Sequence, residues 1–320
     1  MNTFHKLARV AMVLCLCVVI LGAWVRLTDA GLGCPDWPGC YGELIVPADP
    51  GTAAAWPERP LDSGKAWREM IHRYAAGTLG LLVLALAVIS WRRRSDPDQP
   101  RVLPTFLLGL IVFQALLGMW TVTLLLKPVI VMSHLLGGMT TLAILFWLAR
   151  RPVSLVPPAE PGLRRFAMAG LIVLGVQIAL GGWVSTNYAA LACPDLPTCQ
   201  GQYWPAMDFV AGFDPWHGLG IDYEGGILHN AARVAIHFTH RVGAIITAIV
   251  LGLLAWRAWR HPGLAGAAAW LTVMLIAQLA LGLVMVATQL PLSLATAHNG
   301  VAALLLLSVV NLNRMVRHEN

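Results

Sequence analysis

The sequence predicts an all-α integral membrane protein with eight transmembrane helices, arranged as two tandem, parallel four-helix bundles. Hydrophobic residues make up 58% of the 320 residues and charged residues 12%, whereas soluble domains carry roughly 25% charged residues. The apolar residues gather into eight stretches, each of about 20 residues and long enough to cross a bilayer core of ~30 Å. The second half of the chain repeats motifs of the first half in the same order, which indicates a duplicated unit.

Hydropathy places the spans in order along the chain. The expected ranges are 9–27, 68–91, 102–124, 130–149, 166–185, 231–256, 264–288 and 292–312. The first stretch has no small-x-small cleavage site before Arg26, so we interpret it as an uncleaved helix rather than a signal peptide.

Basic residues predict the orientation of these spans. They cluster at alternate ends of the apolar stretches, as expected for loops that remain in the cytoplasm. These residues are Lys6, Arg9, Arg92, Arg93, Arg94, Arg101, Arg150, Arg151, Arg164, Arg165, Arg257, Arg260, Arg314 and Arg317. Both termini are therefore expected in the cytoplasm, and loops 28–67 and 186–230 are expected outside. The net charge of +6 does not indicate a nucleic-acid partner, because the basic residues form no single patch.

The repeat sets the expected domains. Cys34-Pro-Asp-Trp-Pro-Gly-Cys40 in the first half matches Cys193-Pro-Asp-Leu-Pro-Thr-Cys199 in the second. Each half has an even number of spans, so the two halves must run in the same direction, unlike inverted transporter repeats. We expect an N-terminal bundle over 1–150, a cytoplasmic linker over 151–165 and a C-terminal bundle over 166–320.

Four histidines repeat in register and are the candidate ligands of a metal cofactor. His72 and His134 lie about one turn into the second and fourth expected spans, and His240 and His298 repeat them. Ionisable residues inside a membrane need partners, and two imidazoles facing each other across a bundle core suit the axial positions of a heme. A single histidine of this kind is more often a hydrogen-bonded residue near a helix end, but four in duplicate favour ligation. Zinc would need further ligands, and copper usually takes Cys or Met as well.

The two halves differ three residues before the first ligand of each pair. Glu69 precedes His72, whereas His237 precedes His240, and positions three apart share a helix face. Glu69 either pairs with Arg73, takes part in chemistry, or does both. Arg73 and Arg241 are candidates for contacts to heme propionates, or else are interfacial anchors.

Four cysteines lie in the loops expected outside. Their separation of six residues, closed by prolines, makes Cys34–Cys40 and Cys193–Cys199 the simplest disulfide pairing, since the outer compartment is oxidising. Other connectivities remain open. We interpret the second pair as a structural staple, and the first pair is either a staple or a redox group.

Together these motifs resemble the heme A synthase family. The resemblance covers nearly the whole chain and rests on the eight spans, the paired cysteines, Glu69-x-x-His72-Arg73, and the remaining three histidines. It implies an enzyme that oxidises the C8 methyl group of heme O to a formyl group, giving heme A for cytochrome c oxidase. It also implies that His72 and His134 ligate heme O, that Glu69 is catalytic, and that His240 and His298 ligate a permanent heme b. His237 has no place in the family pattern.

Three alternatives predict different behaviour. A di-heme electron-transfer cytochrome that oxidises quinol would keep both hemes unchanged and give Glu69 no chemistry. A membrane thiol–disulfide oxidoreductase would depend on Cys34 or Cys199 and not on the histidines. A transporter would need a polar path near the midplane, where Gln114 and Gln278 are the exceptions among apolar residues.

Heme O synthase is an expected partner because a reactive, apolar heme is better handed over than released. The sequence leaves the electron acceptor, the oxygen source and the oligomeric state, including a homo-oligomer, unassigned.

Overall fold

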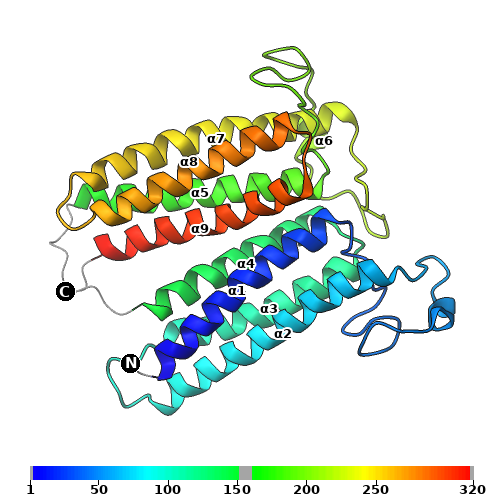
Figure 1. The fold of residues 1–320 in the computed structure, drawn as a ribbon, viewed down its shortest axis with the longest axis horizontal. Helices are drawn as coiled ribbons and strands as arrows, with labels where there is room; N and C mark the ends of the chain where they lie inside the picture. The colour runs from blue at the N-terminus through cyan, green and yellow to red at the C-terminus, as the bar shows by residue number, and fades with distance from the viewer. Residues whose placement is uncertain (1–2, 151–160, 318–320) are drawn as a thin grey trace. The chain divides into compact units, whose positions relative to one another are not determined.

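In a computed structural model, the described residues 3–150 and 161–317 form an all-helical protein without named strands. Eight of its helices are long and apolar enough to cross a membrane (Figure 1), which confirms the predicted class. They are α1 (Thr3–Leu27), α2 (Ser63–Arg92), α3 (Val102–Thr123), α4 (Pro128–Ala149), α5 (Pro161–Thr186), α7 (Asn230–Trp259), α8 (Ala265–Ala287) and α9 (Leu292–Val316). The long loops 28–62 and 187–229 add the short helices η1 (Pro50–Ala55) and α6 (Phe209–Gly212).

Several helices extend beyond the apolar stretches that predicted them. Helix α2 begins at Ser63 rather than near residue 68, because the Asp62 side chain caps it and accepts the N–H of Lys65 at 3.0 Å. Hydropathy misses this polar first turn. The expected linker 151–165 falls mostly on residues 151–160, which lie outside the described residues, and its last five residues already belong to α5.

The chain divides into two compact units. The first comprises Met1–Ala149 together with Pro215–Gly226, and the second comprises Arg150–Asp214 together with Ile227–Asn320. In the first unit α1 and α3 each pack on both α2 and α4, while no contacts join α2 to α4 within the described residues. In the second unit α5 and α8 likewise pack on α7 and α9. The helices that carry the paired histidines are therefore diagonal partners in each bundle.

Helical periodicity separates the bundle core from the lipid-facing surface. On α2, Leu79, Val83 and Leu86 are buried, and they follow one another at intervals of four and three residues. Leu81, Leu84 and Val88 on the other faces of the same helix are exposed. Such apolar exposure suits contact with lipid, because a span without an apolar surface would not partition into a bilayer.

Each unit carries a disulfide-closed hairpin in its long loop. Cys34 is bonded to Cys40 and Cys193 to Cys199, and isolated bridges join Cys40 to Glu43 and Cys199 to Gln202. We call residues 34–45 and 193–204 the first and second cysteine hairpins. Both turn through two residues of positive φ, Tyr41-Gly42 and Gln200-Gly201, which is typical of tight hairpin turns.

A segment of the second long loop belongs to the first unit, which the sequence does not predict. We call residues 215–226 the strap. Its Tyr223 side chain is buried and packs with Leu32, Val122 and Leu126 at the ends of α1 and α3, and its N–H donates to the Leu125 carbonyl at 3.1 Å. The strap therefore adds apolar packing to the loop end of the first bundle.

Charged contacts fix the strap to the same end. Arg59 forms ion pairs with Asp222 and Glu224, the second at 2.7 Å. Lys127, just before α4, is almost fully buried. Its ammonium donates to the Gly218 carbonyl at 2.8 Å and lies 2.9 Å from the centre of the Trp216 ring. The strap thus meets residues close to the ends of all four helices of the first bundle, since Lys65 of α2 also lies 3.5 Å from Glu224.

Candidate functional site

The histidines lie inside the bundles, on diagonal helices. His72 is on α2 and His134 on α4, while His240 is on α7 and His298 on α9. His72 lies nine residues beyond Ser63, about two and a half turns into its helix. The expected depth of one turn was counted from residue 68, and α2 begins five residues earlier because hydropathy does not count its polar first turn.

The imidazoles retain nitrogen atoms that suit an external ligand. The Nδ1 atoms of His72, His134 and His298 are buried and have no hydrogen-bond partner within the described residues. Buried polar atoms are normally paired, so three unpaired ring nitrogens in register fit a ligand that the protein does not itself supply. The fourth, Nδ1 of His240, lies 3.1 Å from the side-chain nitrogen of Gln177.

Four glycines make room for the four imidazoles. A Cβ atom at Gly22, Gly118, Gly181 or Gly282 would lie 3.0, 3.7, 3.2 or 3.3 Å from the ring of His72, His134, His240 or His298, respectively. We call them the cradle glycines. Their register repeats: Gly118 and Gly282 follow the repeated Gln114 and Gln278 by four residues. Sequence reasoning missed their role, although the repeat itself was the signal that could have revealed it.

The donor set of each site suits heme better than zinc. Among the described residues, no group of three or more His, Cys, Asp and Glu side chains gathers where it could hold a metal ion. Each histidine pair is therefore a two-nitrogen site beside small residues, which matches the two axial positions of a heme iron. His72 and His134 would hold one heme and His240 and His298 the other.

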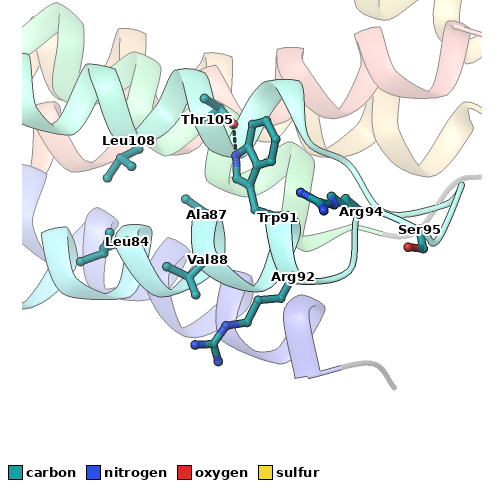
Figure 2. A pocket seen from close by; sticks show the side chains of 9 residues that line it. All are labelled: Leu84, Ala87, Val88, Trp91, Arg92, Arg94, Ser95, Thr105 and Leu108. Atoms are coloured by element: carbon teal, nitrogen blue, oxygen red, sulfur yellow. Dashed lines mark hydrogen bonds between the residues drawn. The ribbon is translucent and has the colours of Figure 1, made fainter.

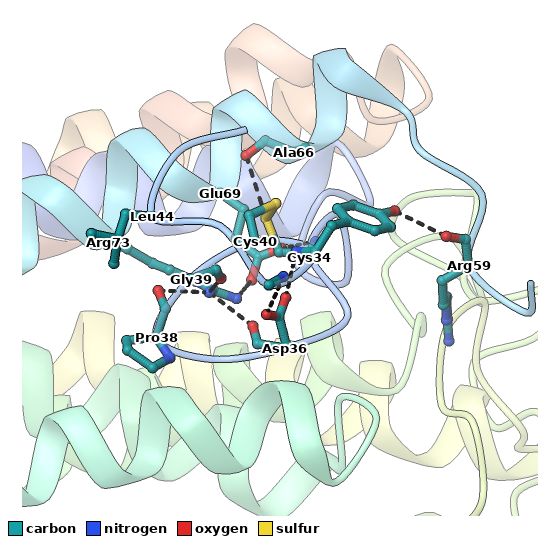
Figure 3. The surroundings of a disulfide bond; sticks show 12 residues. Cys34, Asp36, Pro38, Gly39, Cys40, Leu44, Arg59, Ala66, Glu69 and Arg73 are labelled. Atoms are coloured by element: carbon teal, nitrogen blue, oxygen red, sulfur yellow. Dashed lines mark hydrogen bonds and ion pairs between the residues drawn. A yellow bond between two sulfur atoms is a disulfide. The ribbon is translucent and has the colours of Figure 1, made fainter. Parts of the chain in front are cut away.

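Glu69 is buried beside the first histidine pair and is held by the first cysteine hairpin (Figure 3). Its Oε2 accepts the backbone N–H of Cys34 at 2.9 Å, and its Oε1 forms an ion pair with Arg73. Pairing with Arg73 and a role in chemistry, the two interpretations of Glu69 left open by the sequence, are thus compatible. The carboxylate pairs with Arg73 and still lies one turn from His72. The loop and the helix together fix the orientation of this carboxylate.

His237 takes the corresponding place in the second unit, which explains a residue that the sequence left unassigned. Its Nδ1 accepts the backbone N–H of Cys193 at 3.3 Å. This ring nitrogen is therefore used within the protein, and His237 holds the second cysteine hairpin as Glu69 holds the first.

Arg73 and Arg241 bind the cysteine hairpins. Arg73 donates to the carbonyls of Asp36 at 2.9 Å, Pro38 at 3.2 Å and Gly39 (Figure 3). Arg241 donates to the carbonyls of Asp195 and Thr198, each at 2.9 Å, and of Cys193 at 2.6 Å. These bonds fold each hairpin onto its bundle, and a contact of either arginine with a heme propionate stays a prediction.

A groove at the other end of the first bundle shares no residue with the histidine sites. It lies between α2 and α3, where the Trp91 indole donates to the Thr105 hydroxyl at 2.9 Å beside Arg92 and Arg94 (Figure 2). An aromatic residue among arginines is typical of the membrane–water boundary. The residues that line this groove therefore take no part in the two histidine sites.

Comparison with known proteins identifies the family. The family described as cytochrome oxidase assembly protein matches residues 5–310. A protein named heme A synthase from Shewanella oneidensis is 45% identical over 98% of this chain and 97% of its own length. Proteins of the same name from Rhodospirillum centenum and Halalkalibacterium halodurans are 31% and 27% identical, over 90% and 95% of this chain and 81% and 93% of their own lengths. The chain is a multi-pass membrane protein that belongs to the cytochrome oxidase assembly protein family.

Proposed function

We propose that the chain is a heme A synthase, an oxidoreductase that converts the C8 methyl group of heme O into the formyl group of heme A for cytochrome c oxidase. Membership of the family and the shared name of its curated relatives support this assignment. The two-histidine sites and their cradle glycines suit a heme substrate held inside a bundle.

The asymmetry between Glu69 and His237 favours the first bundle as the reactive one. Turning a methyl group into a formyl group removes hydrogen and adds oxygen, so protons must leave the reacting edge. A carboxylate can accept protons or stabilise positive charge. Among the residues that the structure describes, Glu69 is the only buried carboxylate, and Cys34 and Arg73 orient it. His72 and His134 would hold heme O there.

The second bundle is proposed to hold a permanent heme b between His240 and His298. When bound, that group would supply one-electron transfer. Gln177 and Gln278 lie 3.1 and 3.0 Å from nitrogens of these two histidines and would orient the imidazoles. His237, whose Nδ1 accepts the Cys193 N–H, would keep the second cysteine hairpin in place.

We also propose that both termini are cytoplasmic and that both cysteine hairpins lie on the opposite, outer side of the inner membrane. The basic residues at the opposite helix ends support this orientation. The two disulfides support it independently, because such bonds persist in oxidising compartments.

Extraction of heme with acid acetone from the purified protein, followed by chromatography and mass measurement, tests the function. We expect heme b together with heme O, heme A or a hydroxylated intermediate. Heme b alone at two per chain, from a host that makes heme O, would instead indicate the electron-transfer cytochrome. Absence of any heme would overturn the assignment of all four histidines.

A matched pair of variants tests the role of Glu69. Glu69→Gln keeps the size of the side chain and an oxygen that can accept the Cys34 N–H, so heme O should remain bound while conversion stops. The control, His237→Gln, changes the corresponding position and should retain conversion. Equal loss of conversion in both variants, or loss of bound heme in Glu69→Gln, would contradict a catalytic role for Glu69.

A further inference from the structure

Both cysteine hairpins carry a pair of large apolar residues at the same place, directly after the bridge that closes the turn. In the first hairpin Leu44 and Ile45 are 79% and 58% exposed, and in the second Tyr203 and Trp204 are 77% and 73% exposed. Neighbouring large apolar side chains rarely face water together without a partner. Their repetition in two hairpins of different sequence indicates a shared requirement at these positions. We call Leu44–Ile45 and Tyr203–Trp204 the first and second tips; each pair follows the turn and its closing bridge.

The tips lie against exposed or half-buried residues on helices that cross the membrane. The Tyr74 hydroxyl on α2 donates to the Leu44 carbonyl at 2.7 Å. The Trp204 ring meets the ring of Phe238 on α7 edge to face, with 5.4 Å between centroids. Each tip therefore bends back beside its own bundle instead of extending away from it.

These contacts continue the apolar outer surface of each bundle. On α2 the exposed residues Trp67, Ile71 and Tyr74 follow one another at intervals of four and three, so they share one helix face. On α7 the exposed residues Val242, Ile245 and Ile249 continue the face that begins with Phe238. Since such faces are covered by lipid in a membrane-spanning helix, each hairpin tip extends a lipid-covered surface.

The disulfide-closed part of each hairpin, just before the tip, is held against its bundle. Each part is closed by a disulfide and held by three carbonyl contacts of Arg73 or Arg241. Tyr and Trp at the second tip are the residues that favour the membrane–water boundary, where one end of the ring is apolar and the other is hydrated.

We propose that the two cysteine hairpins dip into the bilayer that the protein spans, with Leu44–Ile45 and Tyr203–Trp204 inserted at the boundary between headgroups and acyl chains. The partner is the lipid surface itself. The proposal does not depend on the heme chemistry. If the proposed function holds, lipid contact would also steady the hairpin that carries Cys34, whose N–H orients Glu69.

Photo-crosslinking to lipid tests this directly. Leu44 and Tyr203 are each replaced by p-benzoylphenylalanine in the full chain, which adds no thiol near the disulfides, and the protein is irradiated in nanodiscs of phosphatidylethanolamine and phosphatidylglycerol. Leu81, an exposed residue in the middle of α2, serves as the lipid-facing reference, and Ala54, exposed in η1 of the first outer loop, serves as the aqueous reference.

Mass measurement of the intact protein counts the lipid adducts. We expect adducts at positions 44 and 203 at least fivefold above the level at Ala54 and within about threefold of the level at Leu81. Adduct levels equal to those at Ala54 would overturn the proposal, and adducts at only one tip would overturn it for the other hairpin. The retained Leu81 signal shows in each preparation that the protein is inserted.

Discussion

Glu69 and His237 do the same structural task in the two halves of the chain: each lies three residues before a candidate axial histidine and accepts the backbone N–H of the first cysteine in its hairpin. The Cys34 nitrogen lies 2.9 Å from Oε2 of Glu69, and the Cys193 nitrogen lies 3.3 Å from Nδ1 of His237. The halves therefore share one scaffold for the loop, and they differ in whether the residue that holds it can also carry a negative charge.

This relationship predicts that Glu69→Ala destabilises the protein more than Glu69→His. Both variants lose the ion pair with Arg73, but alanine also leaves the buried Cys34 N–H without an acceptor, which costs about 1–3 kcal/mol. Histidine can still accept the Cys34 N–H, as His237 does for Cys193. Thermal unfolding in detergent measures the difference, and equal melting temperatures for the two variants would contradict it.

The cradle glycines predict a graded loss of heme. Alanine at Gly22, Gly181 or Gly282 would place a Cβ 3.0–3.3 Å from an imidazole, closer than most side-chain contacts, whereas at Gly118 the distance is 3.7 Å, an ordinary contact. We expect Gly22→Ala to lower heme binding at the first site most and Gly118→Ala to lower it least. Heme content per chain and the Soret spectrum measure the outcome.

Gly80→Ala provides the matched control for these variants, because a Cβ there meets no atom within 4 Å although it lies on α2 with His72. It should keep full heme content, and it should not lower stability, since alanine favours helix over glycine by about 1 kcal/mol. Heme loss in Gly80→Ala equal to that in Gly22→Ala would show that the effect is not a contact with the imidazole.

The strap predicts a charge-swap rescue. Arg59→Glu places like charges beside Asp222 and Glu224 and should increase hydrogen exchange across residues 215–226. Adding Asp222→Arg and Glu224→Arg should restore protection. Because these side chains are 25–48% exposed, each pair contributes less than about 1 kcal/mol, so local exchange reports the change better than global unfolding. Arg101→Ala, at the other end of the bundle, should leave exchange in the strap unchanged.

The second cysteine hairpin predicts a pH effect confined to strong acid. The Thr198 hydroxyl and the N–H groups of Gly201 and Gln200 donate to the Asp195 carboxylate and lower its pKa to about 2. A lowered pKa stabilises the folded hairpin at pH values above the unfolded pKa of about 3.9, and this stabilisation is lost as the pH falls towards 2.

Hydrogen exchange of residues 195–202 between pH 4 and pH 2 measures this effect. The difference in protection between the unmodified protein and Asp195→Asn should be largest at pH 4 and shrink as the pH falls. Residues 36–42 of the first hairpin provide the internal reference, because Asp195→Asn does not alter them. A difference that stays constant between pH 4 and pH 2 would contradict the assignment.

The sequence predicted the features that depend on periodicity and repetition. Eight apolar stretches correspond to eight long helices, and the spacing of the cysteines corresponds to two disulfides, because both depend on local chain geometry. The polar start of α2 was missed because a capped turn of polar residues has no hydropathy signal. The partner of His237 was missed because its hydrogen bond joins residues 44 positions apart, a contact that only the tertiary fold creates.

The strap bears on the order in which the protein is made. Residues 215–226 belong to the first unit, yet they follow α5 in the chain. During translation the ribosome must therefore pass residue 226 before the first unit is complete. While α5 is being synthesised, the four helices of the first unit lack their contacts with Tyr223, and Arg59 and Lys127 lack their partners in the strap. A nascent chain that stopped after residue 149 would leave the first unit with an unfinished loop end.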